Sequence, residues 1–381
     1  MAFRLRPAHM NARVLTVFAL VSLPLLGLVI IVTLGIGQAR LRNAFGMQLS
    51  QVAEQTVSAV DAYLFHRFID VSLMGRTPIV RAASARASAE RFDAGRVREI
   101  DRQWQQSGGK SPEVAAVIGN PTAQFLRDQV QHDSIYREIL LTDRYGRLVA
   151  ASSATTDYDQ SDEDWWLDAA AAGPGGRVTV TDVRWDDSAR VFALEIAVPV
   201  PTPSGDELAG VLKVVADIRE MLAFVLSARI GVTGEATLVR PDGSIVFSQR
   251  PRQADAQFFA ATLLRERLLA VDAGAPIYNL AFTASDDQGA RYVIGVAPSQ
   301  LGMSYPNLSW LVAVSQADAE LFAPVRAQAI SLLIVIAIAT MVVLVFALWF
   351  SMRLAAPPLD IDMKLVEHPP VARIADEETG R

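Results

Sequence analysis

Two long apolar segments without a charged residue constrain this chain more than any other feature of its sequence. Val14–Gly37 contains 24 residues and Ala329–Phe350 contains 22. A helix of about 20 apolar residues is long enough to cross the hydrocarbon core of a bilayer. The sequence therefore predicts two transmembrane helices, 14–37 and 329–350. Residues 38–328 would then lie on one side of the membrane, and the tails 1–13 and 351–381 on the other.

The first apolar segment also has a second interpretation, as a cleaved signal peptide. Its length exceeds the run of about 7–15 apolar residues that is usual in such peptides, and no small-x-small cleavage site precedes Gln38. An uncleaved anchor is therefore favoured. Three arginines in the tail 1–13 favour a cytoplasmic N-terminus, although Arg40 and Arg42 weaken that orientation.

The composition excludes several classes of function. The 381 residues include no cysteine, so no disulfide or thiolate metal site can form. The four histidines are scattered without a spaced pair, which argues against zinc, and the net charge of −6 argues against nucleic acid as a partner. No nucleophile elbow, phosphate-binding loop or kinase signature is present. We expect neither an enzyme, nor a cofactor, nor a bound metal.

Apolar periodicity predicts a long stalk helix over residues 38–83, directly after the first membrane segment. The periodic residues recur mostly at spacings of three or four: Leu41, Phe45, Leu49, Val52, Val60, Leu64, Phe68, Val71 and Met74. Such a helix would be on the order of 60 Å long, which is further than a small domain needs. Residues 84–135 are also expected to be helical, with breaks at Ser107-Gly108-Gly109 and Asn120-Pro121.

After residue 135 the period changes to that of strands, and the pattern occurs twice. Three pairs of segments match at offsets of 97 or 98 residues: Tyr136–Ser152 with Glu235–Gln249, Ile196–Val200 with Ile294–Pro298, and Leu212–Asp217 with Trp310–Ser315. Matches in register indicate a duplicated unit of antiparallel strands, although two unrelated sheet domains stay an alternative. We therefore predict an α+β fold with two tandem antiparallel-sheet modules, 84–222 and 223–328.

Residues 38–328 resemble the double Cache sensor domains of bacterial signalling receptors. The segments that carry the resemblance are LLTDRYGRLVAAS, DEDWW, LEIAVPVPTPSGDELAGVLKVVADI and LVRPDGSIVFS, together with the long first helix and the two apolar segments. The resemblance implies two PAS-like modules on an extracytoplasmic stalk, in a two-pass protein of the bacterial inner membrane. It also implies a membrane-distal module that binds a small ligand, a membrane-proximal module that relays the signal, and a homodimer.

One branch of that family binds amino acids through a recurrent pattern of aromatic and charged residues, which this chain matches in part. Tyr158 stands at the tyrosine position and Trp165 at the tryptophan position. Trp185-Asp186-Asp187 supplies the aromatic-x-Asp element, and Asp217 is the last aspartate. Glu163 stands where the family has an arginine that grips the ligand carboxylate.

The replacement of that arginine changes the expected ligand. A glutamate repels a carboxylate and attracts an amine, and aromatic faces favour cations. We therefore predict an amine or quaternary ammonium ligand, bound by six residues: Tyr158, Glu163, Trp165, Trp185, Asp187 and Asp217. The other acidic residues of this stretch fit a solvated loop, and clustered carboxylates could instead hold Ca²⁺. Trp166 is expected in the core, and Asp217 could simply cap the next helix.

The tail after the second apolar segment has the start of a HAMP-like relay domain. Arg353, Pro358 and Leu359 give that resemblance, but Pro369-Pro370 would break a second helix. A separate cytoplasmic effector is one account of the output, and a truncated histidine kinase, cyclase or chemoreceptor is another. A non-signalling ligand-capturing or envelope scaffold is the alternative from a different class.

Overall fold

The computed structural model describes residues 7–108, 110–186, 191–249, 257–270 and 280–354. The chain divides into two compact units, which are treated separately: 1–36 with 325–381, and 37–324. In the first unit, one helix of the described residues is long and apolar enough to cross a membrane, Ala323–Phe346, within α10 (Ala323–Leu354). The predicted span 14–37 falls in helix α1 (Pro7–Gly75), but most of its side chains lie outside the described residues, as does the tail 355–381.

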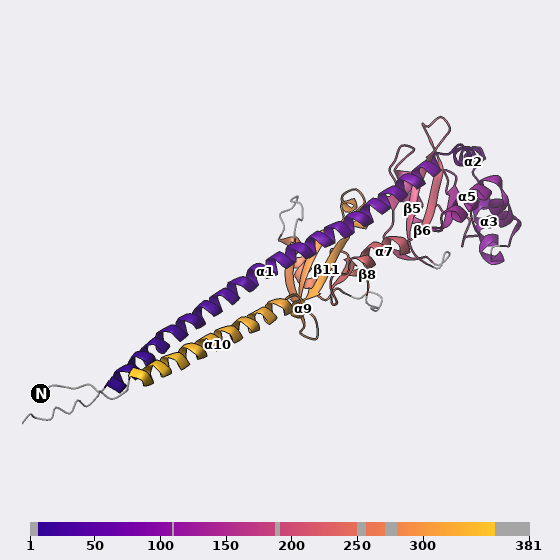
Figure 1. The fold of residues 1–381 in the computed structure, drawn as a ribbon. Helices are drawn as coiled ribbons and strands as arrows, with labels where there is room; N and C mark the ends of the chain where they lie inside the picture. The colour runs from indigo at the N-terminus through magenta and orange to yellow at the C-terminus, as the bar shows by residue number, and fades with distance from the viewer. Residues whose placement is uncertain (1–6, 109, 187–190, 250–256, 271–279, 355–381) are drawn as a thin grey trace, which may run out of the picture. The chain divides into compact units, whose positions relative to one another are not determined.

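In the second unit, the C-terminal part of α1 lies along both sheets and provides the central core element (Figure 1). Its buried side chains repeat at three and four residues and join one continuous core with both sheets: Leu49, Ala53, Val57, Val60, Leu64, Phe68 and Val71. The helix ends at Gly75, earlier than the predicted residue 83. The difference follows from Pro78, which starts α2 (Pro78–Ala89) and holds the preceding Thr77 in an extended conformation.

Three further helices follow, and they are separated at the predicted breaks. These helices are α3 (Ala94–Ser107), α4 (Pro112–Gly119) and α5 (Pro121–His132). Gly108 adopts a left-handed φ of 57° after α3, a conformation that glycine takes without strain. The Asn120 side chain accepts a hydrogen bond from Ala123 N at the start of α5, and Pro121 occupies the first helical position.

The first sheet is antiparallel, with strand order β2-β1-β6-β5-β3 and β4 paired to β5. Its strands are β1 (Tyr136–Thr142), β2 (Leu148–Ala151), β3 (Thr179–Val180), β4 (Arg184–Asp186), β5 (Val191–Pro201) and β6 (Leu208–Asp217). Helix α6 (Asp164–Ala171) covers one face, where Trp165 and Ala169 pack on Ala197 and Val211. Lys213 has the same parity as Val211 in β6, so it points to the α6 side.

The second sheet repeats the strand order of the first, as β8-β7-β11-β10-β9. Its strands are β7 (Glu235–Val239), β8 (Ile245–Ser248), β9 (Leu280–Ser285), β10 (Arg291–Pro298) and β11 (Leu311–Ala317). Its other elements are α7 (Arg219–Ser227), α8 (Ala261–Leu269), α9 (Asp318–Leu321) and the 3₁₀ turns η1 (Leu301–Met303) and η2 (Pro306–Leu308). The three matched segment pairs fall on equivalent strands, so the predicted duplication and the α+β class with two antiparallel sheets are confirmed.

Candidate functional site

The loop between β2 and α6 carries Tyr158 and is hydrogen-bonded to helix α3. Asp101 of α3 accepts hydrogen bonds from the backbone nitrogens of Tyr158 and Asp159, at 2.8 and 3.2 Å from Oδ1. The half-buried Tyr158 ring packs on Trp104, with 5.9 Å between ring centroids. Tyr158 also lines a cavity of about 500 Å³ together with Arg147 and other residues of α2, α4 and β2. The two aromatic rings therefore cover the same sheet from the α3 side.

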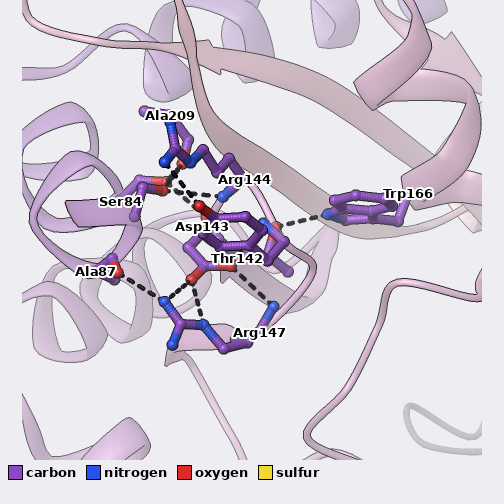
Figure 2. A network of polar contacts seen from close by, with 10 residues as sticks. Ser84, Ala87, Thr142, Asp143, Arg144, Arg147, Trp166 and Ala209 are labelled. Atoms are coloured by element: carbon purple, nitrogen blue, oxygen red, sulfur yellow. Dashed lines mark hydrogen bonds and ion pairs between the residues drawn. The ribbon is translucent and has the colours of Figure 1, made fainter. Parts of the chain in front are cut away.

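A polar network holds the β1–β2 turn against α2 (Figure 2), and the β2–α6 loop joins that turn through a hydrogen bond from Gln160 N to the Gly146 carbonyl at 2.9 Å. Arg147 donates from Nε to Asp143 Oδ2 at 2.5 Å and from Nη2 to the Ala87 carbonyl at 2.7 Å. Gly146 has a φ of 86° in the turn, and a Cβ there would lie 2.6 Å from Ser161. Burial raises the pKa of Asp143, although hydrogen bonds from Tyr145 N and the charge of Arg147 oppose that rise. This network positions the loop that leads to the predicted binding residues.

The two consecutive tryptophans point in different directions from α6. Trp165 is 2 % exposed and packs on the sheet. Trp166 is half-buried, and its Nε1 donates to Thr142 Oγ1 at 3.0 Å (Figure 2). Trp166 was predicted in the core and Trp165 in the pocket, but Trp165 is the ring that joins the buried cluster, and Trp166 packs against that cluster only partly buried. Glu163 stands immediately before α6 at the N-cap, but its side chain makes no capping hydrogen bond.

Lys213 of β6 occupies the face of the Trp165 ring, and the sequence had not predicted it. Its Nζ lies 5.0 Å from the ring centroid and 2.8 Å from Oε1 of Glu195 in β5. Arg184 also forms an ion pair with Glu195. Both Lys213 and Glu195 are buried, so the protein places a cation of its own between an aromatic face and a carboxylate. The one available signal was a single lysine inside the apolar run LAGVLKVVAD.

Two carboxyl groups of the acidic loop, Glu163 and Asp157, have raised pKa values. Burial raises the pKa of Glu163, and the charges of Asp157, Asp162 and Glu195 raise it further, whereas Lys213 lowers it. Burial likewise raises the pKa of Asp157, and Asp101 and Asp162 add to the effect against hydrogen bonds from Gln160 and Thr156. Burial is therefore the main reason that the ionised forms of Glu163 and Asp157 are disfavoured, and the nearby carboxylates add to it.

Asp217 lies at the end of β6 in a set of ion pairs with two arginines. Its Oδ2 accepts from Nη2 of Arg137 at 2.7 Å and lies 2.7 Å from Nη2 of Arg219. Its Oδ1 accepts from the backbone nitrogen of Arg219, the first residue of α7, at 2.9 Å, although the N-cap position of that helix is occupied by Ile218. Burial raises the pKa of Asp217, but the hydrogen bonds from Arg219 and Arg137 outweigh burial and leave the pKa below its ordinary value.

Comparison with known proteins identifies the family from the sequence. The sequence model for the Cache domain, in its double form, matches residues 38–325. The chain belongs to the double Cache family. Cache domains of this type are extracytoplasmic sensor domains of membrane receptors. Curated protein sequences give no match.

Solved structures with similar folds are double Cache ligand-binding domains of chemoreceptors. The domain of Campylobacter jejuni Tlp3 with L-norvaline has 12 % identity and a TM-score of 0.49, and the match covers 75 % of this chain and 95 % of that one. The domain of Pseudomonas aeruginosa PctB with L-Arg has 17 % identity and a TM-score of 0.42, and the match covers 72 % of this chain and 96 % of that one. The domain of Pseudomonas fluorescens CtaA with L-serine has 16 % identity and a TM-score of 0.44, and the match covers 72 % of this chain and 98 % of that one.

In this Cache domain, the structure brings only some of the six predicted residues together. Glu163 and Trp165 adjoin each other at the start of α6, on the side of the sheet that carries Lys213. Tyr158 packs on Trp104 instead, and Asp217 forms ion pairs with Arg137 and Arg219. The backbone of Trp185 pairs with Phe192 in the β4–β5 ladder, but the Trp185 side chain and all of Asp187 lie outside the described residues.

A metal site does not emerge from the same carboxylates. Within the described part of the chain, no group of three or more His, Asp or Glu side chains lies close enough together to hold an ion. Asp157 is engaged by hydrogen bonds from Gln160 and Thr156, which use its Oδ1 atom.

Proposed function

We propose that this protein is a membrane-anchored extracytoplasmic sensor whose first module binds a small cationic ligand, an amine or a quaternary ammonium compound. The observation that carries this proposal is the face of the buried Trp165 ring, over which a cation lies 5.0 Å from the centroid, with Glu163 immediately before the same helix and its side chain without a capping hydrogen bond. An aromatic face and a neighbouring carboxylate both favour a cation that binds beside them. This role requires binding and no catalytic step.

A second candidate ligand class, an amino acid, is favoured by a specific pair of donors. Trp165 Nε1 is buried, and none of the described groups accepts a hydrogen bond from it. The Lys213 ammonium lies beside the same ring. Together they could receive a ligand carboxylate, as the missing arginine would, while Glu163 receives the ligand ammonium. A buried unsatisfied donor costs about 1–3 kcal/mol, which a ligand acceptor would recover.

Transmission across the membrane is proposed to run through a homodimer with paired α1 helices. Three large apolar side chains on α1 are exposed at a spacing of four residues: Phe65 by 53 %, Ile69 by 40 % and Leu73 by 60 %. A stripe of this kind is the face expected to pack on a second helix. Ligand binding would favour one arrangement of the pair, and α1 and α10 would pass it to a separate cytoplasmic effector. A scaffold without signal output would show no such ligand-dependent change.

The test uses the full chain in lipid nanodiscs and a panel of amines, quaternary ammonium compounds, amino acids, carboxylates and Ca²⁺. A ligand at 100 times its Kd stabilises the folded state by about 2.7 kcal/mol, which raises the Tm by a few degrees. A shift with amines and quaternary ammonium compounds that is lost in Glu163→Gln supports the cationic class. A shift restricted to amino acids, lost in Lys213→Met as well, supports the second candidate. No shift with any compound contradicts both.

Because the chain has no cysteine, single cysteines can report on the dimer. Cysteine at Phe65 or Ile69 should cross-link two chains, whereas cysteine at Val57 or Val60, which are buried in the core, should not. A ligand-dependent change in the cross-linking rate supports relay. Monomers at every position from 49 to 73 contradict the paired-helix proposal.

A further inference from the structure

A second cavity, of about 610 Å³, lies where the first module adjoins α7 and β8. This volume falls within the range of about 300–1,000 Å³ that is usual for small-molecule sites. Its apolar wall combines residues of both modules: Val183, Phe192, Leu222, Val246 and Phe247. Neither Glu163 nor Trp165 lines it, so it is separate from the site proposed above.

One end of this junction cavity is positively charged. Arg137, Asp217 and Arg219 form that end. The Asp217 carboxylate balances only one of the two guanidinium charges, and both guanidinium groups contact the same oxygen, Oδ2, through Nε and Nη2. The contacts with Asp217 use Nε and Nη2 of each arginine and not Nη1. The Arg219 side chain is 73 % exposed and can therefore turn toward a bound anion.

The opposite wall is apolar and partly open to water. Phe192 is 58 % exposed, while Val246 and Phe247 are half-buried around the same space. Burying such side chains under a ligand removes apolar area from water, at about 25 cal/mol for each Å². The wall therefore favours a ligand with a compact apolar body.

We infer that the junction cavity binds a small amphipathic monocarboxylate, of the chemical class of short-chain fatty acids and aromatic acids. The carboxylate pairs with Arg137 and Arg219, because the planar guanidinium fork matches a carboxylate in two-point geometry. The apolar body lies between Phe192 on the first module and Phe247 on the second. A bound ligand thus links the two modules at α7, the helix that follows β6 directly.

The experiment measures binding of sodium hexanoate and sodium benzoate to the full chain in lipid nanodiscs by titration calorimetry. Both should bind saturably, and hexylamine and benzylamine, which have the same apolar bodies with the opposite charge, should not bind at this cavity. Arg219→Ala should weaken carboxylate binding about tenfold, because one charge-assisted pair is lost. Val246→Trp, which fills the apolar end, should abolish binding while Arg219 stays in place.

Two control variants separate this proposal from the other site. Arg265→Ala removes an exposed arginine of the same charge from α8 and should leave hexanoate affinity unchanged. Glu163→Gln should also leave it unchanged, although it would weaken binding of a cation in the first module. The inference is overturned if hexanoate and benzoate do not bind saturably. It is equally overturned if their affinity survives both Arg219→Ala and Val246→Trp, or if Glu163→Gln alone abolishes it.

Discussion

Lys213 holds its ammonium group 5.0 Å from the centroid of the Trp165 ring, in the position that a cationic ligand of this aromatic face would take. The pair belongs to different layers, because Lys213 lies in β6 and Trp165 in the helix that covers the sheet. Glu195 completes the arrangement at 2.8 Å from Lys213 Nζ. Lys213 therefore partly fills the face of the Trp165 ring. Any ligand cation that binds there must share the neighbouring carboxylates with Lys213.

Lys213→Met should destabilise the fold and strengthen cation binding. The substitution leaves the buried Glu195 with Arg184 alone, and breaking a buried pair costs about 3–5 kcal/mol, so roughly 3 kcal/mol of unfolding free energy should be lost. Urea denaturation measures the loss, and calorimetry measures the gain in affinity. Lys110→Met, at an exposed lysine, is the matched control and should change neither. Unchanged stability of Lys213→Met would contradict the buried ion pair.

The affinity for a cationic ligand should rise with pH through the titration of Glu163. The folded pKa of Glu163 lies above its ordinary value of 4.5, so Glu163 destabilises the folded state progressively as the pH rises from about 4.5 through the folded pKa. A cation binds the ionised form and offsets that loss. Calorimetry between pH 4.5 and 7.5 should show affinity increasing with pH in the wild type and a flatter profile in Glu163→Gln. A profile that is identical in both proteins would exclude Glu163 as the titrating group.

Local sequence signals predicted most of the elements and their repetition. Gly108 and Asn120-Pro121 marked helix ends by their own conformational preferences, and the matched segments placed β1, β2, β5 and β6 beside their counterparts in the second sheet. Pro78 would have given the end of α1 as well, because a proline disfavours helix at the residue before it.

The chemistry of the site depended on strand register, which no local pattern specifies. Lys213 and Glu195 meet because β5 and β6 pair with Ala197 opposite Lys213 and Val215 opposite Glu195. Asp217 meets Arg137 across 80 residues through the pairing of β1 with β6. A family sequence pattern identifies which residues of this chain are equivalent to known binding residues. It does not show which side chains those residues contact in this chain.

Trp166→Phe should lower stability without altering ligand binding. The substitution removes the hydrogen bond from Nε1 to Thr142 Oγ1, worth about 0.5–1.5 kcal/mol, and some packing area, so a loss of roughly 1–3 kcal/mol is expected. Thermal unfolding measures it. The neighbouring Leu167, which is 48 % exposed, provides the control, since Leu167→Ala should cost less than about 0.5 kcal/mol. Loss of ligand binding in Trp166→Phe at unchanged stability would instead place this ring in the site.

Asp217→Asn should destabilise the protein at neutral pH and lose its effect in acid. The folded pKa of Asp217 lies below its ordinary value of 3.8, so its ion pairs stabilise the folded state fully above that value and lose this contribution as the pH falls through the folded pKa. Asparagine keeps the side-chain oxygen that accepts a hydrogen bond from Arg219 N but cannot pair with Arg137 and Arg219 as an anion. Unfolding free energies of wild type and Asp217→Asn, measured from pH 7 down to about pH 2, should therefore differ at neutral pH and converge below about 3.8. Asp287→Asn, at an exposed aspartate without an ion pair among the described residues, is the control and should leave the unfolding free energy unchanged at neutral pH. A difference between wild type and Asp217→Asn that persists unchanged at pH 2 would show that Asp217 acts through its hydrogen bond from Arg219 N and not through its charge.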